Sequence, residues 1–289
     1  MKPFTSEHKL TVLILTFNED VNIEQALKSV QNWADHVFIL DSFSSDCTLE
    51  IASYYGCAIF QNKFENYAKQ RNYALEQLPI KTEWVFFLDA DEWVSDDLKI
   101  EISFRIASTP KENGFYIKRR LIWMGRWIRR GYYPSWQLRL FRHRKGRCED
   151  REINEHLLVD GDVGYLINDF TDENRKGISD WILKHNNYAS REAHELFNSR
   201  ISKGYQEINV SFFGSQAQRR RWLRYNIWNK LPPLIRPFFY FLYRYIFLCG
   251  FLDGREGFMF HFLQALWYPL LIDIKYLELK MFHLKNVNN

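Results

Sequence analysis

The sequence predicts an α/β protein that begins with a doubly wound, Rossmann-like sheet and ends in a mostly helical, aromatic-rich region. Three observations support this prediction. Short apolar runs alternate with helical periods over the first third of the chain, and acidic residues stand where two of these runs end. Aromatic residues make up 17% of the chain. With 289 residues and 46% hydrophobic side chains, the chain can bury a sizeable core, which excludes wholesale disorder.

The N-terminal part alternates predicted strands and helices. The strands are short apolar or β-branched runs bounded by polar residues, as in buried parallel sheets: residues 10–16, 36–40, 58–60 and 84–88. The helices between them carry apolar residues on one face: residues 22–30, 46–51 and 67–78. Ligands of such sheets bind outside the carboxyl ends of the strands, so Asp41 and Asp89 are expected to face one crevice.

Charge and cysteine content restrict the class of protein. The net charge of +4 argues against a dedicated nucleic-acid binder. From Arg200 to Arg244, however, nine Lys or Arg stand against one acid, which suggests a nearby anionic surface. The four cysteines form no CxxC pair, so we expect a reducing cytoplasm and neither a zinc site nor a disulfide framework. The first nine residues are polar, and we expect no signal peptide.

The most informative motif is Asp89-Ala90-Asp91-Glu92, directly after an apolar strand. Alternate carboxylates on a turn suit Mg²⁺ or Mn²⁺, which bind oxygen ligands together with substrate phosphates. A polar turn that ends a strand is the plain alternative. A phosphatase nucleophile is disfavoured, because those enzymes carry the motif on the first strand with Thr or Val following, whereas Glu92-Trp93 follows here.

Two further segments offer groups for a nucleotide. The carboxylate of Asp41 can accept hydrogen bonds from a base N–H or a ribose hydroxyl, or it can cap the turn that follows. The run Lys69-Gln70-Arg71-Asn72 lies on the third predicted helix and offers cations for phosphates, although a solvated helix face explains such a run equally well.

Four segments occur in the order expected for family 2 glycosyltransferases: Thr16–Glu19, Asp41–Thr48, Lys69–Asn72 and Asp89–Glu92. Over roughly residues 10–188 the sequence therefore resembles this family of inverting enzymes with the GT-A fold. The nearest resemblance is to bacterial enzymes that build lipopolysaccharide core and other surface polysaccharides. It implies a nucleotide-sugar donor, with a UDP-sugar as the first expectation, and Mg²⁺ or Mn²⁺ as cofactor.

The resemblance also implies roles for individual residues. Thr16, Asn18 and Glu19 would line the nucleotide pocket, and Asp41 would hold the base or the ribose. Arg71 would lie near the diphosphate. Asp89 would contact ribose or metal, and Asp91 would bind the metal directly.

An inverting transfer needs a general base that deprotonates the acceptor hydroxyl. The acids in the right region are Glu149, Asp150, Glu152 and Glu155. We favour Glu155, because residues 153–159 resemble the His-Glu and apolar strand of the core-polysaccharide enzymes. Asn154 stands where His is usual and His156 follows, so His156 or Glu152 stay open as partners or substitutes, and a plain loop acid is the remaining alternative.

A strand is also predicted around Trp136, Arg139 and Arg142. A period of two places Arg139 and Arg142 on opposite faces, so only one of them can reach the site. We favour Arg139 as a donor-binding residue.

The last third of the chain contains two aromatic, apolar runs, 234–251 and 258–272. Charged residues and prolines interrupt them, and neither supplies the about 20 apolar residues of a spanning helix. Basic residues beside aromatic helices favour an interfacial, monotopic surface attracted to anionic lipid. We expect Arg219-Arg220-Arg221 and the helix after Pro237 to act together there. Packing against the rest of the chain, or against a second subunit in a homo-oligomer, is the alternative.

Together these features predict a catalytic domain at residues 1–190 and a helical, membrane-associating region at 191–289. The expected activity is sugar transfer, with inversion, to a saccharide on a lipid carrier or lipid A core. The expected location is peripheral, on the cytoplasmic face of the membrane. A polyprenyl-phosphate glycosyltransferase and a non-catalytic nucleotide-binding module are the alternatives.

Overall fold

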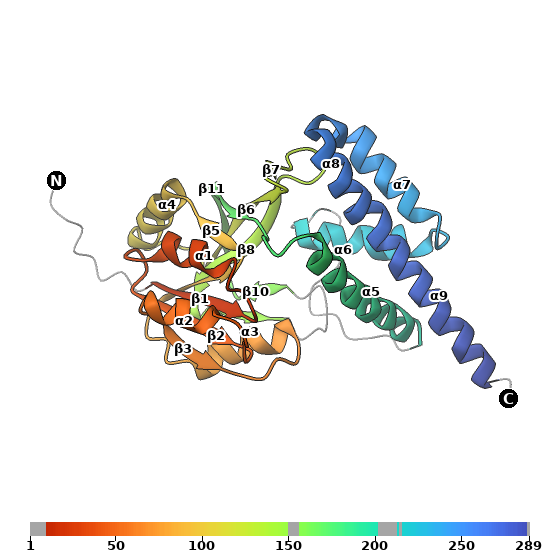
Figure 1. Cartoon of the computed structure of the whole chain (residues 1–289). Helices are drawn as coiled ribbons and strands as arrows, with labels where there is room; N and C mark the ends of the chain where they lie inside the picture. The colour runs from red at the N-terminus through yellow and green to blue at the C-terminus, as the bar shows by residue number, and fades with distance from the viewer. Residues whose placement is uncertain (1–9, 150–155, 202–212, 214–215, 288–289) are drawn as a thin grey trace. The chain divides into compact units, whose positions relative to one another are not determined.

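The computed structural model describes residues 10–149, 156–201, 213 and 216–287. The chain divides into two compact units (Figure 1). The first, the sheet unit, comprises Met1–Ile122 and Tyr133–Lys176. The second, the helical unit, comprises Trp123–Tyr132 and Gly177–Asn289. The boundary expected after residue 190 falls inside a helix, α5 (Ile178–Ile201), which packs along the last helix of the chain and so belongs to the helical unit from its first turn.

The sheet unit is built on a nine-stranded sheet in the order β3-β2-β1-β4-β8-β6-β11-β5, with β7 paired to β6. Four neighbouring strands are parallel: β1 (Leu10–Thr16), β2 (His36–Asp41), β3 (Ala58–Gln61) and β4 (Trp84–Asp89). The other strands of this sheet are β5 (Glu92–Val94), β6 (Gly114–Trp123), β7 (Arg126–Trp127), β8 (Ser135–Arg142) and β11 (Val163–Asp172). A separate antiparallel pair joins β9 (Gly146–Cys148) to β10 (Leu157–Val159). The predicted doubly wound α/β class is confirmed.

Both faces of the parallel strands are buried, as their continuous apolar runs predict. On one face, Val12 and Phe86 pack with residues of α1 (Ile23–Val30) and α4 (Asp96–Ala107). On the other face, Leu13 and Phe87 pack with residues of α3 (Tyr67–Gln77). The remaining helix of this half, α2 (Thr48–Tyr54), follows β2. Side chains of successive strand residues alternate between the faces, so each run supplies both cores.

The register of the sheet brings the polar strand ends into line. Thr16 at the end of β1 pairs with Asp41 at the end of β2. On the other side of β1, Leu15 pairs with Asp89 at the end of β4. Farther along the sheet, Asp172 at the end of β11 lies opposite Glu92 in the antiparallel β5. Carboxylates that are far apart in the sequence therefore meet along one edge.

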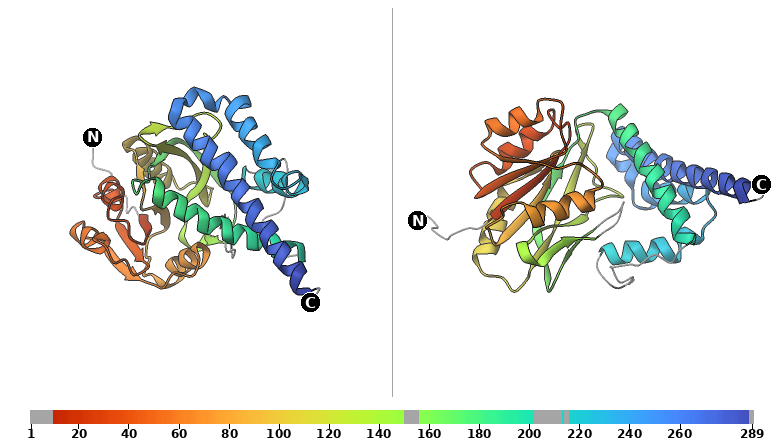
Figure 2. Two further views of the ribbon diagram at one scale, coloured as in Figure 1. Left: turned by 45° about the vertical axis from the view of Figure 1, so that its right-hand side comes forward. Right: turned by 90° about the horizontal axis from the view of Figure 1, so that it is seen from below.

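The helical unit contains α5, α6 (Gln216–Asn226), α7 (Arg236–Leu242), α8 (Gly254–His261) and α9 (Tyr268–Val287). Two π-helical segments extend these helices, Tyr243–Phe247 after α7 and Phe262–Trp267 between α8 and α9. Short 3₁₀ turns occupy His143–Lys145 in the sheet unit and Trp228–Lys230 and Gly250–Asp253 in the helical unit. Figure 2 shows α5 and α9 lying against each other. Ala193 and Leu196 of α5 and Tyr276 of α9 form a buried apolar cluster.

The basic stretch of the helical unit is not one exposed surface. Arg219 is exposed, but Arg221 is only 5% exposed, and Arg224 pairs with Glu192 at 2.7 Å. The expectation that the run of arginines at 219–221 faces anionic lipid as a block is therefore wrong for Arg221. Successive residues of an α-helix are rotated by about 100°, so Arg219 and Arg221, two positions apart, point to nearly opposite sides.

By length and composition alone, the helical stretch Gly250–His283 could cross a membrane. The most apolar part of this stretch is 39% buried inside the molecule, and core helices of soluble proteins can have the same length and composition. From the sequence, neither apolar run is long enough to span a membrane cleanly. In the structure the run 258–272 is part of the longer helical stretch Gly250–His283.

Candidate active site

Asp89 ends β4 and lies between two guanidinium groups. Arg139 Nη2, from β8, donates to Asp89 Oδ2 at 2.8 Å. Arg71 Nη2, from α3, lies 3.4 Å from Asp89 Oδ1. The antiparallel pairing of β8 beside β4 places Arg139 here, although 50 positions separate the two residues in the chain. Three residues singled out in the sequence thus come together.

The buried side chain of Glu92 contacts both Arg139 and the backbone of Asp89. Its side chain is 1% exposed, its Oε1 lies 2.6 Å from Arg139 Nη2, and its Oε2 accepts a hydrogen bond from the backbone N–H of Asp89 at 2.9 Å. Burial raises the pKa of Glu92 well above its usual range; Arg139 opposes that rise, and the charge of Asp89 adds to it. A buried carboxylate that bonds both the turn and the arginine fixes the geometry of the acidic motif.

The two arginines of β8 reach different surroundings. Arg139 is 5% exposed, and its guanidinium lies over the ring of Phe170 at 5.3 Å. Arg142 forms an ion pair with Glu83 and donates to the carbonyl of Pro110, away from the acidic cluster. The period of two along the strand separates them, and Arg139 is the one at the site.

Among the described residues, the side chain of Asp91 is bonded by an amide, whereas that of Asp89 is bonded by guanidinium groups. Asn174 Nδ2 donates to Asp91 Oδ2 at 3.0 Å, and the backbone N–H of Glu173 donates to the Asp91 carbonyl at 2.9 Å. The side chain is half-buried. Asp91 therefore has carboxylate lone pairs that can face a ligand.

These surroundings decide which residue fits a divalent ion. Asp89 is neutralised by guanidinium groups, which disfavours its expected role as a second metal ligand. Among the residues that the structure describes, no group of three or more His, Cys, Asp or Glu is placed to hold an ion. Mg²⁺ commonly takes only one or two protein carboxylates plus substrate phosphates. The residues present fit an ion held by Asp91 together with a bound diphosphate.

Asp41 is fully buried and already makes several hydrogen bonds. Thr16 Oγ1 donates to its Oδ1 at 2.9 Å, and Ser44 donates through both its backbone N–H and its hydroxyl. Gln61 Nε2 adds a longer contact of 3.4 Å. A carboxylate has about four acceptor sites. The structure shows Asp41 in its alternative role, bonding the turn that follows β2, while the Thr16 hydroxyl oxygen keeps acceptor capacity.

Asn18 and Glu19 lie on the loop after β1, which is bonded to the loop after β2. Asn18 has a left-handed backbone (φ 52°), its N–H donates to Ser44 Oγ at 2.8 Å, and its Oδ1 accepts from Ser45 N. The Glu19 N–H donates to Thr48 Oγ1 at 2.7 Å. The two loops form one surface at the carboxyl ends of the strands.

Two aromatic side chains on these loops escaped the sequence analysis. Phe17 and Phe43 are each 56% exposed, and Phe43 also has a left-handed backbone (φ 63°). Bulky residues seldom adopt that conformation, so its occurrence in a loop beside the site is notable. Exposed aromatic faces are surfaces on which nucleobases stack. An apolar residue inside a polar strand-end loop was the available signal.

The segment after β11 also escaped notice, although it supplies a cation. Lys176 Nζ donates to Glu19 Oε1 at 2.7 Å, and Asn22 Nδ2 donates to Glu19 Oε2 at 2.8 Å. Burial raises the pKa of Glu19, and the negative charge of Asp91 contributes to the rise, so the two carboxylates interact electrostatically. The run 172–176 begins at the last residue of β11, whose sequence is more polar than those of β2 and β4, so the signal that identified Asp41 and Asp89 is weak here.

Glu155, the expected general base, lies outside the described residues, as do Asp150 and Glu152. Hydrogen bonds hold the residues on either side of this segment. The Glu149 N–H donates to the His156 carbonyl at 2.9 Å, and the Asn72 side chain bonds the backbone N–H and carbonyl of Cys148. Glu149 is 1% exposed, so it is a poor candidate for meeting an acceptor.

Comparisons with known proteins agree with this topology. The family model described as glycosyl transferase family 2 matches residues 11–156. An uncharacterized glycosyltransferase of Rickettsia bellii (strain RML369-C) is 34% identical over 118 residues, 41% of this chain and 40% of that protein. The SPbeta prophage-derived glycosyltransferase SunS of Bacillus subtilis (strain 168) is 31% identical over 97 residues, 32% of this chain and 22% of that protein.

The chain thus spans about two-fifths of the length of its Rickettsia relative. Among solved structures, residues 1–349 of S. aureus TarS in complex with UDP-GlcNAc align with 93% of this chain and 92% of that chain. The identity is 14% and the TM-score is 0.43, too low to say anything of activity. The family model, by contrast, covers half of the sequence and includes every described site residue up to His156. The chain belongs to glycosyl transferase family 2.

Proposed function

We propose that the protein transfers a sugar from a nucleotide-sugar donor, with inversion, and that a divalent cation assists. The observation that carries this proposal is the arrangement at the carboxyl ends of β1, β4 and β11. There, half-buried Asp91 shares one edge with the cations Arg71 and Lys176. A nucleoside diphosphate needs such a combination, because its phosphates bind both a metal ion and basic side chains.

The proposed division of labour follows from exposure. Asp91 would hold Mg²⁺ or Mn²⁺, and such an ion supplies positive charge to the departing diphosphate. Arg71 and Lys176 would contact phosphate oxygens, with Glu19 releasing Lys176 as the donor binds. Phe17 and Phe43 would flank the base, for which uracil is our first choice. Arg139 and Glu92 are too buried to touch the donor and act as positioning residues.

For the acceptor hydroxyl we propose Glu155 as the general base. Glu155→Gln should keep donor binding and lose transfer by about 10²-fold or more, the contribution of a lost general base. The matched change Glu152→Gln should cost much less. If Glu152→Gln is inactive and Glu155→Gln is active, Glu152 is the base instead.

The acceptor we propose is a saccharide on a lipid carrier or on a lipid A core, reached from the cytoplasmic face of a membrane. Its support is the resemblance to enzymes of surface-polysaccharide synthesis, together with the exposed aromatic side chains of the helical unit. A phosphate acceptor, as in polyprenyl-phosphate glycosyltransferases, would give a sugar phosphate instead of a glycoside, so product analysis separates the two.

The test is a screen of nucleotide sugars by thermal unfolding, with and without Mn²⁺. Ligands that bind only the folded state raise its stability, so one donor should stand out and should need the ion. That donor is then supplied with saccharide acceptors, and the anomeric configuration of the product is read by NMR. Retention of configuration, or binding without any turnover across lipid-linked acceptors, would overturn the proposal.

A further inference from the structure

Between residues 234 and 262 the helical unit buries most of its charged side chains and exposes many of its aromatic ones. Arg236 is 2% exposed and pairs with Asp273, which is fully buried. Arg244 is 4% exposed; its Nε donates to the Gly131 carbonyl at 2.8 Å, and its guanidinium lies over three aromatic rings. His261 is fully buried and lies 3.0 Å from the Arg130 carbonyl. The residues that interrupt the two apolar runs in the sequence therefore point inward.

With those residues turned inward, the outside is apolar. We call the following side chains, each at least 40% exposed, the outer apolar face: Leu234, Ile235, Phe238, Phe239, Leu242, Tyr243, Ile246, Phe247, Leu248, Phe251, Leu252, Phe258 and Phe262. Along α7 they recur three and four residues apart, the spacing of one side of a helix. A soluble helix would place its charges on this side.

The charges that do border this face suit a phospholipid leaflet. Between residues 234 and 262, all of which are described, the exposed charged side chain is Arg255. Glu256, the neighbouring acid, is half-buried and lies 3.6 Å from Arg126. Lys230 is exposed just before the face begins. An uncharged face with cations at its margin complements acyl chains beneath a layer of phosphates.

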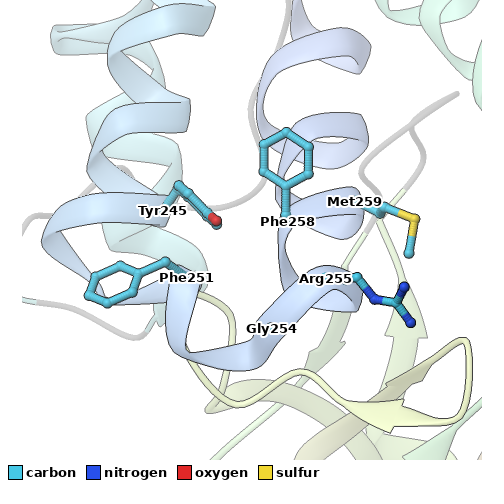
Figure 3. Close-up of a pocket in the computed structure, with 6 residues that line it drawn as sticks. All are labelled: Tyr245, Phe251, Gly254, Arg255, Phe258 and Met259. Carbon is cyan, nitrogen blue, oxygen red and sulfur yellow. The ribbon is translucent and has the colours of Figure 1, made fainter.

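Arg255 also lines a pocket of about 590 Å³ within this face, with Tyr245, Phe251, Gly254, Phe258 and Met259 (Figure 3). Tyr245 comes from the π-helical segment after α7 and Phe251 from the turn before α8; the other residues belong to α8. In Figure 3 the Arg255 guanidinium is directed away from the rings of Tyr245 and Phe251, so the rings can meet hydrocarbon while the guanidinium reaches toward a phosphate.

We propose that the outer apolar face lies in the acyl layer of one membrane leaflet, with Arg255 at the level of the lipid phosphates. This inference deepens the proposed action at a membrane and rests on it. Binding then comes mainly from apolar insertion and not from the basic run at 219–221. The helix Gly250–His283 lies along the leaflet without crossing it, because crossing would carry Asp273 and its partner Arg236 into lipid.

The test is co-sedimentation of the full chain with phosphatidylcholine vesicles, with and without phosphatidylglycerol, at low and high salt. Wild-type protein should bind both kinds of vesicle with a modest preference for the anionic ones, and high salt should reduce that preference without abolishing binding. Phe239→Asp/Phe247→Asp should weaken binding by about tenfold or more, since charges replace inserted aromatic rings. The matched control is Ile100→Asp/Phe104→Asp, two side chains of α4 in the sheet unit that are 68% and 70% exposed; it should bind like wild type.

Arg255→Glu separates a specific phosphate contact from insertion: it should remove the preference for anionic vesicles and keep binding to neutral ones. Circular dichroism and donor-induced thermal shifts verify that each variant folds, and the donor shifts report separately on the proposed catalytic function.

Wild-type protein that stays in the supernatant overturns the inference, as does equal binding by Phe239→Asp/Phe247→Asp. A dimer in solution that this variant splits would make the face a subunit interface. Protease protection of residues on opposite sides of the vesicle wall would make the helix a span.

Discussion

Asp89 and Asp91 stand two positions apart, and their neighbours give them different tasks. Asp89 accepts hydrogen bonds from Arg139 and closes a buried network with Glu92. Among the described residues, Asp91 accepts from the neutral donors Asn174 Nδ2 and the backbone N–H of Glu173, which leaves carboxylate lone pairs for a ligand. The same residue type is therefore structural at position 89, and at position 91 it has the proposed role of binding the ligand, because Asp89 is the one held by Arg139.

This difference predicts opposite phenotypes for the two amides. Asp91→Asn should leave unfolding almost unchanged, and it should lower turnover by about 10²-fold or more, because metal stabilisation of charge supplies several kcal/mol. Asp89→Asn should destabilise the fold by about 1–3 kcal/mol, since Arg139 loses a charged partner. Urea unfolding and transfer assays on both variants measure this. Near-normal activity of Asp91→Asn in Mn²⁺ would refute the metal assignment.

At the scale of elements, segments that follow strands build the site. The loop after β1 is bonded to the loop after β2 through Asn18 and Glu19. The segment after β11 adds Lys176 and Asn174. Because the strands end on one edge, short loops from distant parts of the chain can share one ligand.

Lys176 provides a test of this arrangement. Lys176→Ala should weaken donor binding by about 10- to 100-fold, the value of a charge-assisted hydrogen bond to phosphate. Binding of the nucleoside without phosphates should stay unchanged. The measurement is calorimetric titration of both ligands, and Lys99→Ala on α4 is the control, since Lys99 pairs with exposed Asp96 away from the site. Equal loss for nucleoside and nucleotide would place Lys176 elsewhere.

The surroundings of His261, at the end of α8, predict a pH dependence of the free energy of unfolding. Burial lowers the pKa of His261 to about 4, and the charge of Arg244 adds to the shift, while the bond to the Arg130 carbonyl opposes it. The buried Nδ1 has no hydrogen-bond partner among the described residues. A histidine with a lowered pKa in the folded state stabilises fully above its unfolded value near 6.5, and this contribution disappears as the pH falls toward 4.

Wild-type protein should therefore lose roughly 2 kcal/mol of unfolding free energy between pH 6.5 and 5 through this residue. His261→Gln, which can still donate to the carbonyl, should lose less over the same interval. Denaturant unfolding at several pH values gives both slopes. The slope that persists in the variant should include His185, whose pKa burial also lowers to about 4. Identical slopes would contradict the assignment.

At the scale of the whole molecule, each unit has its own kind of interior. The sheet unit is held by two apolar cores on either side of parallel strands. The helical unit relies on buried ion pairs and aromatic contacts, and it exposes apolar side chains. The apolar outside of the helical unit is the feature on which the proposed binding to a lipid surface rests.

The ion pair of Arg236 and Asp273 tests this view of the helical unit. Asp273→Ala leaves a buried guanidinium without its carboxylate and should cost about 3–5 kcal/mol. Arg236→Met/Asp273→Leu should recover most of that stability, because apolar residues replace the charges. The readout is thermal unfolding followed by tryptophan fluorescence. Donor binding should persist in both variants below their melting temperatures, since Asp91 and Lys176 belong to the sheet unit.

The sequence alone determined the order of strands and helices in the first half and the acidic residues after β4. Both depend on neighbours along the chain: apolar runs of strand length, and the rule that parallel sheets bind ligands where strands end. Arg139 was also within reach of sequence reasoning, because period-two alternation along a strand separates it from Arg142.

Only the tertiary structure decided which charges meet. Lys176 and Glu19 are 157 positions apart, and Arg139 and Asp89 are 50 apart, so strand order and register had to exist before either pair could be seen. The same holds for Arg236 and Arg244. In the sequence they interrupt an apolar helix, but packing against the rest of the helical unit turns them inward and leaves the apolar side chains outside. The direction of a side chain depends on what packs beside its helix, and sequence position does not record that.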